Sequence, residues 1–567
     1  MTRRYSLFLS LIVIFFEHSV QARTQTTLDY ESRIHPEIAD DFMVVSQNKH
    51  ATEAGYEILK KGGNAIDASV AVGFALAVTL PRAGNLGGGG FILIYDKDKD
   101  EVSSIDYRSA APKSATSDLF LNGDQVVRFG HLVNAVPGSV AGLLKAHEDY
   151  GTLPLSALLK PAIRLAKDGF EVTYDLNFVL EWGKESMLAN PSSKNKFYES
   201  SGDPIKVKSN FIQPTLAKTL FMISKRGSDI FYKGEIAQWI SEESLSNGGL
   251  ITLEDMASYE AKYREPIEVS YRGYRIVSMP PAASGGLVLL QTLNILENFD
   301  LKEFGHNSAQ TIHILSEAMQ RAYADRAEYH GDPDYYDVPV KALLNKQYSS
   351  DLSKTILEER TPNGKIFEGD LKRYDESPDT THFSIIDSKG NAVSNTYTLG
   401  SSFGSGVTIR KGGFLMNNQM RNFSHFYGQA NAKFGTSEAN KLEPGKRMIS
   451  TQTPTLVFKP TGELMMILGS PGGGRIPNII TQVISNVIDH EMSFTEAVMA
   501  PRINQRLEDR LQLETGFSPD TINLLKERGH DPESSTTMGS VQAIFLEPKK
   551  IFGVADTRRP GALAKGN

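Results

Sequence analysis

The fold of this chain is decided by the stretch PDTTHFSIID, residues 378–387. Its part from 382 to 386 combines apolar, aromatic and β-branched residues over a length typical of a buried strand. Residues 387–391 are dense in turn formers, and residues 392–399 predict a second strand. The stretch therefore predicts a β-hairpin whose first strand begins with two threonines.

The register of this hairpin brings two hydroxyl groups together. A turn centred on Lys389 places Thr398 opposite Thr380, within an error of one or two residues. A Thr hydroxyl needs an adjacent base, and the α-amine of a chain-terminal Thr, with an unperturbed pKa of about 7.7–8.0, can serve. Thr380 acquires such an amine only if the Asp379–Thr380 bond is broken. A purely structural Thr pair is the alternative that these residues alone leave open.

The first 22 residues have the pattern of a secretory signal. Arg3 and Arg4 give a basic start, residues 7–16 are almost wholly apolar, and residues 20–22 offer small side chains for cleavage. The apolar run is too short to span a bilayer, which takes about 20 residues. We expect a secreted or periplasmic protein, with an uncleaved anchor as the alternative.

The composition is that of an ordinary globular protein. Of 567 residues, 40% are hydrophobic and 22% are charged, and the net charge of −7 argues against nucleic acid or an anionic membrane as partner. The chain has no Cys, so disulfides and thiolate chemistry are excluded. Its 12 His show no ligand spacing, and no cofactor signature appears, so we expect neither metal nor cofactor.

The large N-terminal part predicts mainly helices. Residues 49–61 form a helix that stops at two glycines, and residues 65–80 predict a helix buried on all sides. Residues 155–350 are mainly helical, with a strand pair at 267–271 and 274–278.

Two glycine runs need close backbone approach or positive φ angles. The first, residues 87–90, precedes the strand predicted at 92–96, and GxGxxG spacing is absent, which excludes a dinucleotide loop. The second lies in SPGGGR, residues 470–475, between a strand at 464–468 and a helix. No Gly-Lys-Ser/Thr follows it, which excludes a Walker phosphate loop. A tight turn is its simplest interpretation.

Long ordered motifs resemble one family. The run TTHFSIID…GNAVSNTYTL, with NNQM (417–420) and GSPGGGRI (469–476), is similar to the small subunit of γ-glutamyltranspeptidases, and the resemblance extends from about residue 34 to the C-terminus. These N-terminal-nucleophile hydrolases cleave themselves before a Thr. The resemblance implies an α/β (α+β) fold, a four-layer αββα sandwich. It also implies a signal peptide (1–22), a large subunit (23–379) and a small subunit (380–567), which form one compact heterodimer.

The resemblance assigns roles to particular residues. It implies cleavage between Asp379 and Thr380, with Thr380 as nucleophile and Thr398 orienting it. For the other roles it implies Gly472 and Gly473 as oxyanion donors, Arg108, Ser450 and Thr451 on a substrate carboxylate, and Gln419 and residue 422 on the substrate amine. A guanidinium suits the carboxylate because it is always charged and can bind it through two hydrogen bonds. His382 follows the Thr pair on the strand, which indicates a structural or maturation role.

The amine side departs from the family pattern. Relatives carry two Asp after NNQM or NNEM, whereas this chain has Arg421 and Asn422, and Gly400 stands where many relatives have Asn. Of the usual amine contacts only Gln419 remains. Losing one charged hydrogen bond typically costs about 1.5–3 kcal/mol. We hypothesise better use of unaminated dicarboxylic acyl groups, unless another acidic residue takes over.

The segment between Ser424 and Arg447 has the length and place of the family's lid. Phe434 falls where relatives carry an aromatic residue over the active site, and a lid that excludes water favours transfer over hydrolysis. A plain surface loop is the alternative.

The resemblance as a whole implies a self-processing γ-glutamyltransferase and glutathione hydrolase. It would cleave glutathione or other γ-glutamyl amides through a Thr acyl-enzyme, with water, an amino acid or a peptide as acceptor. A glutaryl-type (cephalosporin) acylase with the same machinery is one alternative, and an uncleaved, non-enzymatic binding protein is another.

Overall fold

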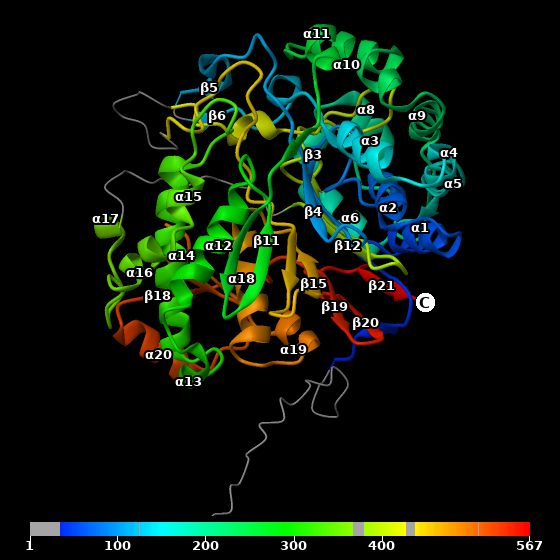
Figure 1. The fold of residues 1–567 in the computed structure, drawn as a ribbon. Coiled ribbons are helices and arrows are strands. Elements are labelled where there is room, and N and C mark those ends of the chain that lie inside the picture. The colour runs from blue at the N-terminus through cyan, green and yellow to red at the C-terminus, as the bar shows by residue number, and fades with distance from the viewer. Residues whose placement is uncertain (1–33, 124, 367–378, 427–436, 508–509) are drawn as a thin grey trace, which may run out of the picture.

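Two seven-stranded antiparallel sheets dominate the protein and lie face to face, with helices over both outer faces (Figure 1). The computed structural model describes residues 34–567 except 124, 367–378, 427–436 and 508–509. The predicted signal, the Phe434 lid position and residues 367–378 before the predicted cleavage site lie outside the described residues.

The first sheet, sheet I, contains the hairpin predicted from the sequence. Its strands in spatial order are β21 (Leu563–Gly566), β2 (Met43–Ser46), β12 (Thr381–Ile386), β13 (Ala392–Thr398), β3 (Gly89–Asp96), β4 (Glu101–Tyr107) and β9 (Lys262–Arg264). Every residue of β12 and β13 is buried, as expected of strands covered on both faces. The predicted register is confirmed, because Thr381 lies opposite Tyr397, one pair inward from Thr380 and Thr398.

The second sheet, sheet II, carries the strand that leads into the second glycine run. Its strands in spatial order are β1 (Glu37–Ala39), β20 (Lys550–Ala555), β19 (Gln542–Glu547), β15 (Leu464–Gly469), β14 (Thr455–Phe458), β11 (Tyr274–Ser278) and β10 (Ile267–Tyr271). The bounds of β10 and β11 are those predicted from the sequence. Smaller sheets are formed by β16 (Ile503–Asn504), β17 (Arg510–Leu513) and β18 (Asp531–Ser534), by β5 (Leu121–Asn122) and β6 (Gln125–Val126), and by β7 (Phe170–Glu171) and β8 (Asn210–Phe211).

The helices divide between the two outer faces. Around sheet I lie α1 (Lys49–Lys60), α2 (Ala65–Thr79), α3 (Ser139–Tyr150), α4 (Leu155–Leu158), α5 (Lys160–Asp168), α6 (Tyr174–Trp182), α7 (Lys184–Leu188), α8 (Pro191–Phe197), α9 (Pro214–Tyr232), α10 (Glu235–Ser246) and α11 (Leu253–Ala257). Around sheet II lie α12 (Ser284–Leu296), α13 (Leu301–Phe304), α14 (Ala309–Tyr329), α15 (Val340–Leu343), α16 (Lys346–Ser353), α17 (Asn363–Ile366), α18 (Ile476–Ile488), α19 (Phe494–Met499) and α20 (Pro519–Glu527). Short 3₁₀ turns comprise η1 (Ser117–Phe120), η2 (His131–Val133), η3 (Gln419–Asn422) and η4 (Gly473–Arg475).

Three apolar cores hold these layers together. One packs α1, α2 and their neighbours on sheet I, a second packs α12, α14 and α18 on sheet II, and a third fills the space between the sheets. Helix α2 is buried along its whole length, as predicted. Its one charge, Asp67, closes a capping box with Asn64 and accepts hydrogen bonds from Thr152, so it is satisfied at the helix start.

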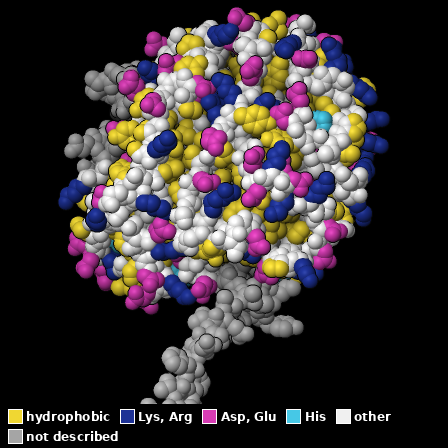
Figure 2. All heavy atoms as spheres, in the orientation of Figure 1, with side chains coloured by type: hydrophobic (Ala, Val, Ile, Leu, Met, Phe, Trp, Pro, Cys, Tyr) yellow, Lys and Arg dark blue, Asp and Glu magenta, His cyan; other side chains and the backbone are white. Residues whose placement is uncertain are grey.

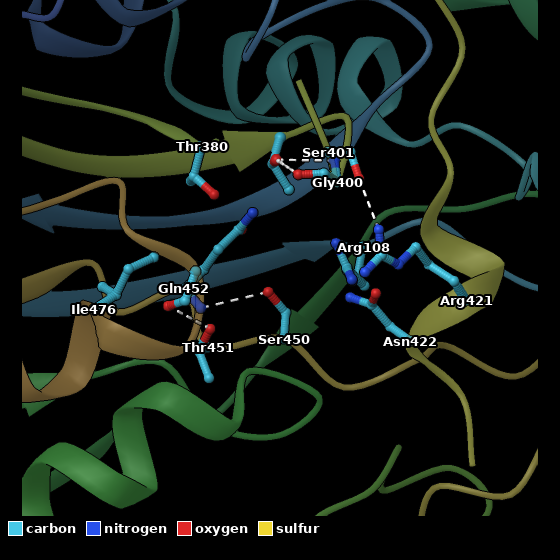
Figure 3. Close-up of a pocket in the computed structure, with 12 residues that line it drawn as sticks. Arg108, Thr380, Gly400, Ser401, Arg421, Asn422, Ser450, Thr451, Gln452 and Ile476 are labelled. Carbon is cyan, nitrogen blue, oxygen red and sulfur yellow. Dashed lines mark hydrogen bonds between the residues drawn. The ribbon is translucent and has the colours of Figure 1, made fainter. Parts of the chain in front are cut away.

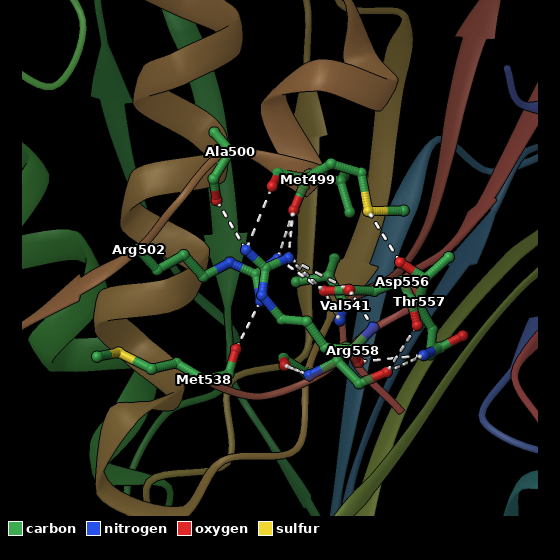
Figure 4. Close-up of polar contacts among 12 residues, drawn as sticks. Met499, Ala500, Arg502, Met538, Val541, Asp556, Thr557 and Arg558 are labelled. Carbon is green, nitrogen blue, oxygen red and sulfur yellow. Dashed lines mark hydrogen bonds and ion pairs between the residues drawn. The ribbon is translucent and has the colours of Figure 1, made fainter. Parts of the chain in front are cut away.

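A buried ionic cluster anchors the C-terminal segment to sheet II (Figure 4). Asp556 pairs with Arg502 at 2.8 Å and with Arg558 at 3.2 Å, and Arg558 also pairs with Glu514 at 2.7 Å. Burial raises the pKa of Asp556, but the two guanidiniums outweigh it and hold this pKa below its ordinary value. The cluster fixes the backbone next to Arg559. The Arg559 side chain in turn approaches Asp379, beside the predicted cleavage site.

On the face seen in Figure 2, basic and acidic side chains intermingle between apolar ones. Within the described ranges, no helix is both long enough and apolar enough to cross a membrane.

Candidate active site

A small pocket, partly open to solvent, lies beside the start of β12. Figure 3 shows Thr380 on one side, Ser450 and Thr451 on the opposite side, and Arg108 at one end. The lining residues come from segments far apart in the chain: Arg108, Thr380, Thr398, Gly400, Ser401, Arg421, Asn422, Ser450, Thr451, Gln452, Gly473 and Ile476.

The Thr398 side chain contacts the peptide bond that precedes Thr380. Its hydroxyl donates a hydrogen bond of 2.7 Å to the carbonyl oxygen of Asp379 and accepts one of 2.9 Å from the Gly400 N–H. Thr380 is 5% exposed and lines the same pocket. A donor on that carbonyl oxygen makes its carbon more electrophilic, at the atom that the Thr380 hydroxyl would attack.

The Asp379 side chain lies near two guanidiniums, of which that of Arg82 is buried. Its carboxylate lies 3.5 Å from Arg559 and 3.9 Å from Arg82, and it accepts a hydrogen bond from Ser402. Arg82 in turn pairs with Asp175 at the start of α6, at 3.3 Å. Asp379, the residue before the predicted cleavage point, is therefore held from two sides.

Arg108 directly follows β4 and is 1% exposed. Its guanidinium donates to the carbonyl oxygens of Met448 and Ile449, at 3.3 and 3.4 Å, which places it beside Ser450. The neighbouring Asp106–Arg447 ion pair, at 2.7 Å, joins the same two segments.

The Ser450–Thr451 segment is rigidly attached to its surroundings. The Ser450 N–H donates to the Ala282 carbonyl at 3.1 Å, and its carbonyl accepts from the Ser284 hydroxyl at 2.9 Å. The Thr451 hydroxyl donates to the Gly473 carbonyl at 2.9 Å. Two hydroxyls and a guanidinium thus stand together at the end of the pocket where the family motifs predict a substrate carboxylate.

The second glycine run turns into the pocket just before α18. Gly472 and Gly473 have φ angles of 144° and 56°, a backbone conformation that side chains disfavour. Gly473 lines the pocket, and Gly472 is the residue before it in the chain. Because α18 begins three residues later, its dipole also favours negative charge here.

The side of the pocket predicted to face the substrate amine is polar but carries positive charge. Arg421 and Asn422 both line it, and Arg421 donates to the Ser401 hydroxyl at 2.8 Å. Gly400 has φ of 101°, and a Cβ there would lie 2.3 Å from the Asn418 amide oxygen. Glycine at 400 is therefore required by this local packing.

A family model described as Gamma-glutamyltranspeptidase matches residues 51–566. The chain belongs to the gamma-glutamyltranspeptidase family. It is 45% identical over 546 residues to the glutathione hydrolase proenzyme of Escherichia coli K12, covering 94% of this chain and 93% of that protein. This confirms the resemblance found in the sequence motifs.

Proteins named as acylases are also similar to this chain. The acylase ACY 1 proenzyme of Pseudomonas sp. SE83 is 35% identical over 546 residues, covering 94% of this chain and 95% of that protein. The crystal structure of a cephalosporin acylase from Bacillus halodurans superposes with a TM-score of 0.84 at 29% identity, covering 98% of this chain and 99% of that one.

The structure brings most of the residues predicted from the family motifs to one pocket. Gln419 stands apart from the lining set; it is fully buried and donates to the Thr398 carbonyl at 2.8 Å, while its amide oxygen has no partner among the described residues. The roles of all these residues in substrate binding and catalysis stay predictions.

Gln452 was missed in the sequence, although it directly follows Ser450 and Thr451. It lines the pocket at 1% exposure, and neither its amide oxygen nor its amide nitrogen has a hydrogen-bond partner among the described residues. Its position next to the two hydroxyls was the available signal.

His382 is a buried structural residue in this fold. Its ring nitrogens contact the hydroxyls of Thr396 and Ser384, at 2.7 and 3.1 Å, and burial lowers its pKa to about 3. A neutral, fully buried imidazole outside the lining set agrees with the structural role proposed for it. Within the described residues, no group of three or more acidic or His side chains is arranged to hold a metal.

Proposed function

We propose that this family member is a self-processing γ-glutamyltransferase and glutathione hydrolase. The observation that carries the proposal is the Thr398 hydroxyl on the Asp379 carbonyl oxygen, at the edge of a pocket that also holds Thr380, Arg108 and Gly473. The hydrogen bond is buried and joins the Thr398 hydroxyl to the carbonyl of Asp379, directly before the Thr380 hydroxyl. An ordinary surface hairpin does not need this arrangement.

In the processing step, the Thr380 hydroxyl attacks the carbonyl carbon of Asp379. The C–N bond breaks, an ester forms, and the hydroxyl proton goes to the released Thr380 nitrogen. Water then hydrolyses the ester, which leaves a carboxylate on Asp379 and a free α-amine on Thr380. This amine is the base that an internal Thr lacks.

In turnover, Thr380 attacks the γ-amide carbon of glutathione or a similar donor. The α-amine takes the hydroxyl proton and passes it to the leaving amine, and Thr398 orients the nucleophile. The N–H groups of Gly472 and Gly473 stabilise the oxyanion, and Arg108, Ser450 and Thr451 hold the substrate carboxylate. Water, an amino acid or a peptide resolves the acyl-enzyme.

We further propose that the two products, residues 23–379 and 380–567, stay together as a heterodimer with the four-layer fold of N-terminal-nucleophile hydrolases. The support is that β12 pairs with β2 and β13 pairs with β3, so the β12–β13 hairpin of one product lies between two strands of the other within sheet I. Export through residues 1–22 to the periplasm or outside the cell completes the proposal.

A glutaryl-type acylase is the second candidate. It is favoured by Asn422 and Arg421, because the lining residues include two guanidiniums and no carboxylate to pair with a donor ammonium. The similarity to proteins named acylases agrees with it.

The deciding experiment compares γ-glutamyl-p-nitroanilide with glutaryl-p-nitroanilide on the purified protein, after its state of cleavage has been checked, with Thr380→Ala as blank. A kcat/KM clearly higher for the γ-glutamyl donor supports the transferase. Equal or faster glutaryl turnover supports the acylase. No turnover of either donor, with the Asp379–Thr380 bond intact, would make the protein a binding protein.

A further inference from the structure

The loop that follows the two pocket hydroxyls presents one polar side chain that the fold itself does not use. The Ser450 hydroxyl accepts a hydrogen bond from the Gln452 N–H, and the hydroxyls of Thr451 and Thr453 donate to the carbonyl oxygens of Gly473 and Thr451. Gln452 is equally buried, and both polar atoms of its carboxamide lack partners among the described residues. Figure 3 shows its side chain extending from the loop towards the space beside Thr380.

The Gln452 side chain is therefore placed to bind a ligand. Burying an unsatisfied polar group costs about 1–3 kcal/mol, so a carboxamide that lines a pocket gains free energy when a bound molecule satisfies it. A carboxamide both donates and accepts, and it matches an uncharged group that does the same, such as an amine or an amide.

The position of Gln452 indicates which part of the substrate it reaches. The acyl chain of a donor must run from the carboxylate end, at Arg108 and Ser450, to the reacting carbonyl at Thr380. Gln452 extends between these two ends. Between them a γ-glutamyl group carries one further polar substituent, the nitrogen on its α-carbon.

The charges around that substituent disfavour an ammonium. Arg108 and Arg421 line the pocket, and its lining residues include no Asp or Glu. A nearby cation shifts an amine towards its neutral form, which a carboxamide can bind through both a donor and an acceptor.

We infer that Gln452 is a substrate-binding residue that recognises the donor's α-nitrogen as an uncharged group. The substrate class is then ω-amides of dicarboxylic acids in which the carbon bearing the free carboxylate also carries a neutral amine or an acylated nitrogen. This inference rests on the proposed acyl transfer by Thr380 and refines its substrate.

The test uses three p-nitroanilides on processed enzyme: γ-glutamyl, N-acetyl-γ-glutamyl and glutaryl. Wild type is expected to hydrolyse the N-acetyl donor within about tenfold of the glutaryl donor. Gln452→Leu is expected to lower kcat/KM for the N-acetyl donor about 10–100-fold and to leave the glutaryl donor within about threefold. Gln452→Glu is expected to favour the γ-glutamyl donor at pH 7, because it supplies an anion for the ammonium.

A pH profile gives a second readout that a structural role would not move. The wild-type ratio of γ-glutamyl to glutaryl kcat/KM should rise as pH passes the donor's own amine pKa, since titration of the enzyme cancels in the ratio. Gln238→Leu, at an exposed position of α10, is the matched control and should change none of these values.

Three results would overturn the inference: equal loss for all three donors in Gln452→Leu, rejection of the N-acetyl donor by more than 100-fold in wild type, or a ratio that is flat with pH. The wild-type measurements decide even if a variant fails to process. If processed wild type hydrolyses no donor, the proposed function fails instead.

Discussion

At the scale of single residues, one hydrogen bond of the fold lies at the peptide bond that we propose is cleaved. Thr398 donates to the Asp379 carbonyl oxygen at 2.7 Å, and its own oxygen is held by the Gly400 N–H. The hydroxyl is thus preorganised where negative charge would develop during self-cleavage, which is the arrangement that stabilises a tetrahedral intermediate.

Replacing Thr398 by Val keeps the shape of the side chain and removes this donor. We expect self-cleavage to slow by about 10²-fold, because removing one donor to an oxyanion costs about that factor. The rate is measured from conversion of the precursor to two chains on a denaturing gel. Thr398→Ser keeps the hydroxyl and should stay within about tenfold of wild type, and equal rates for both variants would contradict the prediction.

Asn422 is the residue at which a single charge can be restored. Asn422→Asp should raise the ratio of γ-glutamyl to glutaryl kcat/KM by about 10–100-fold, since a carboxylate gains a charged hydrogen bond to the donor ammonium. Steady-state kinetics with both p-nitroanilides at pH 7 measure it. Asn422→Gln leaves the position uncharged and should not raise the ratio. A rise in this variant would point to a change in the shape of the pocket instead.

At the scale of elements, the start of β12 is held by segments from both ends of the chain. Arg82 follows α2 and pairs with Asp175 and Asp379, while Arg559 approaches Asp379 from the C-terminal segment. The ionic cluster around Asp556 fixes the residue next to Arg559 (Figure 4). These contacts fix the carbonyl of Asp379 on Thr398.

Removing one of these anchors should slow processing without abolishing it. Arg559→Ala is expected to reduce the rate of self-cleavage about tenfold, because Asp379 keeps Arg82 and Ser402 but is held less firmly. Arg510→Ala, at a side chain that is 63% exposed, is the control. Processing at the wild-type rate in Arg559→Ala, checked by mass spectrometry of the new Thr380 terminus, would show that this contact is dispensable.

At the scale of the whole molecule, packing keeps several histidines neutral. Burial is the largest cause that lowers the pKa of His306 and His425 to about 4, and of His330, His382 and His530 to about 3. In the unfolded chain each would have a pKa near 6.5. Below pH 6.5 the unfolded state therefore binds more protons than the folded state does.

The consequence is a loss of stability in mild acid. Each such His contributes a slope of up to about 1.4 kcal/mol per pH unit, starting below pH 6.5 and ending near its folded pKa. We expect the Tm of the processed protein to fall between pH 7 and pH 5, as measured by differential scanning calorimetry at constant ionic strength. An unchanged or rising Tm over this interval would refute the expectation.

Local sequence pattern was enough to predict the elements that are set by their own turn residues or hydrophobic run. The β10–β11 hairpin turns at Arg272 and Gly273, which have φ angles of 51° and 85°, and such a two-residue turn sets the register of its strands. The β12–β13 register followed from the turn at 387–391 in the same way. The uninterrupted apolar run of α2 predicted a helix buried all round for the same local reason.

The sequence by itself determined the family, the hairpin and the identity of most pocket residues, because turn chemistry, periodicity and motifs are local properties. Tertiary structure alone decided that Arg82 and Arg559 hold Asp379, that Gly400 is required by Asn418, and that the Gln452 carboxamide lies buried beside Thr380. Those facts depend on how loops from distant segments pack at the edge of two sheets, and no local pattern encodes which polar atoms such packing leaves without a partner.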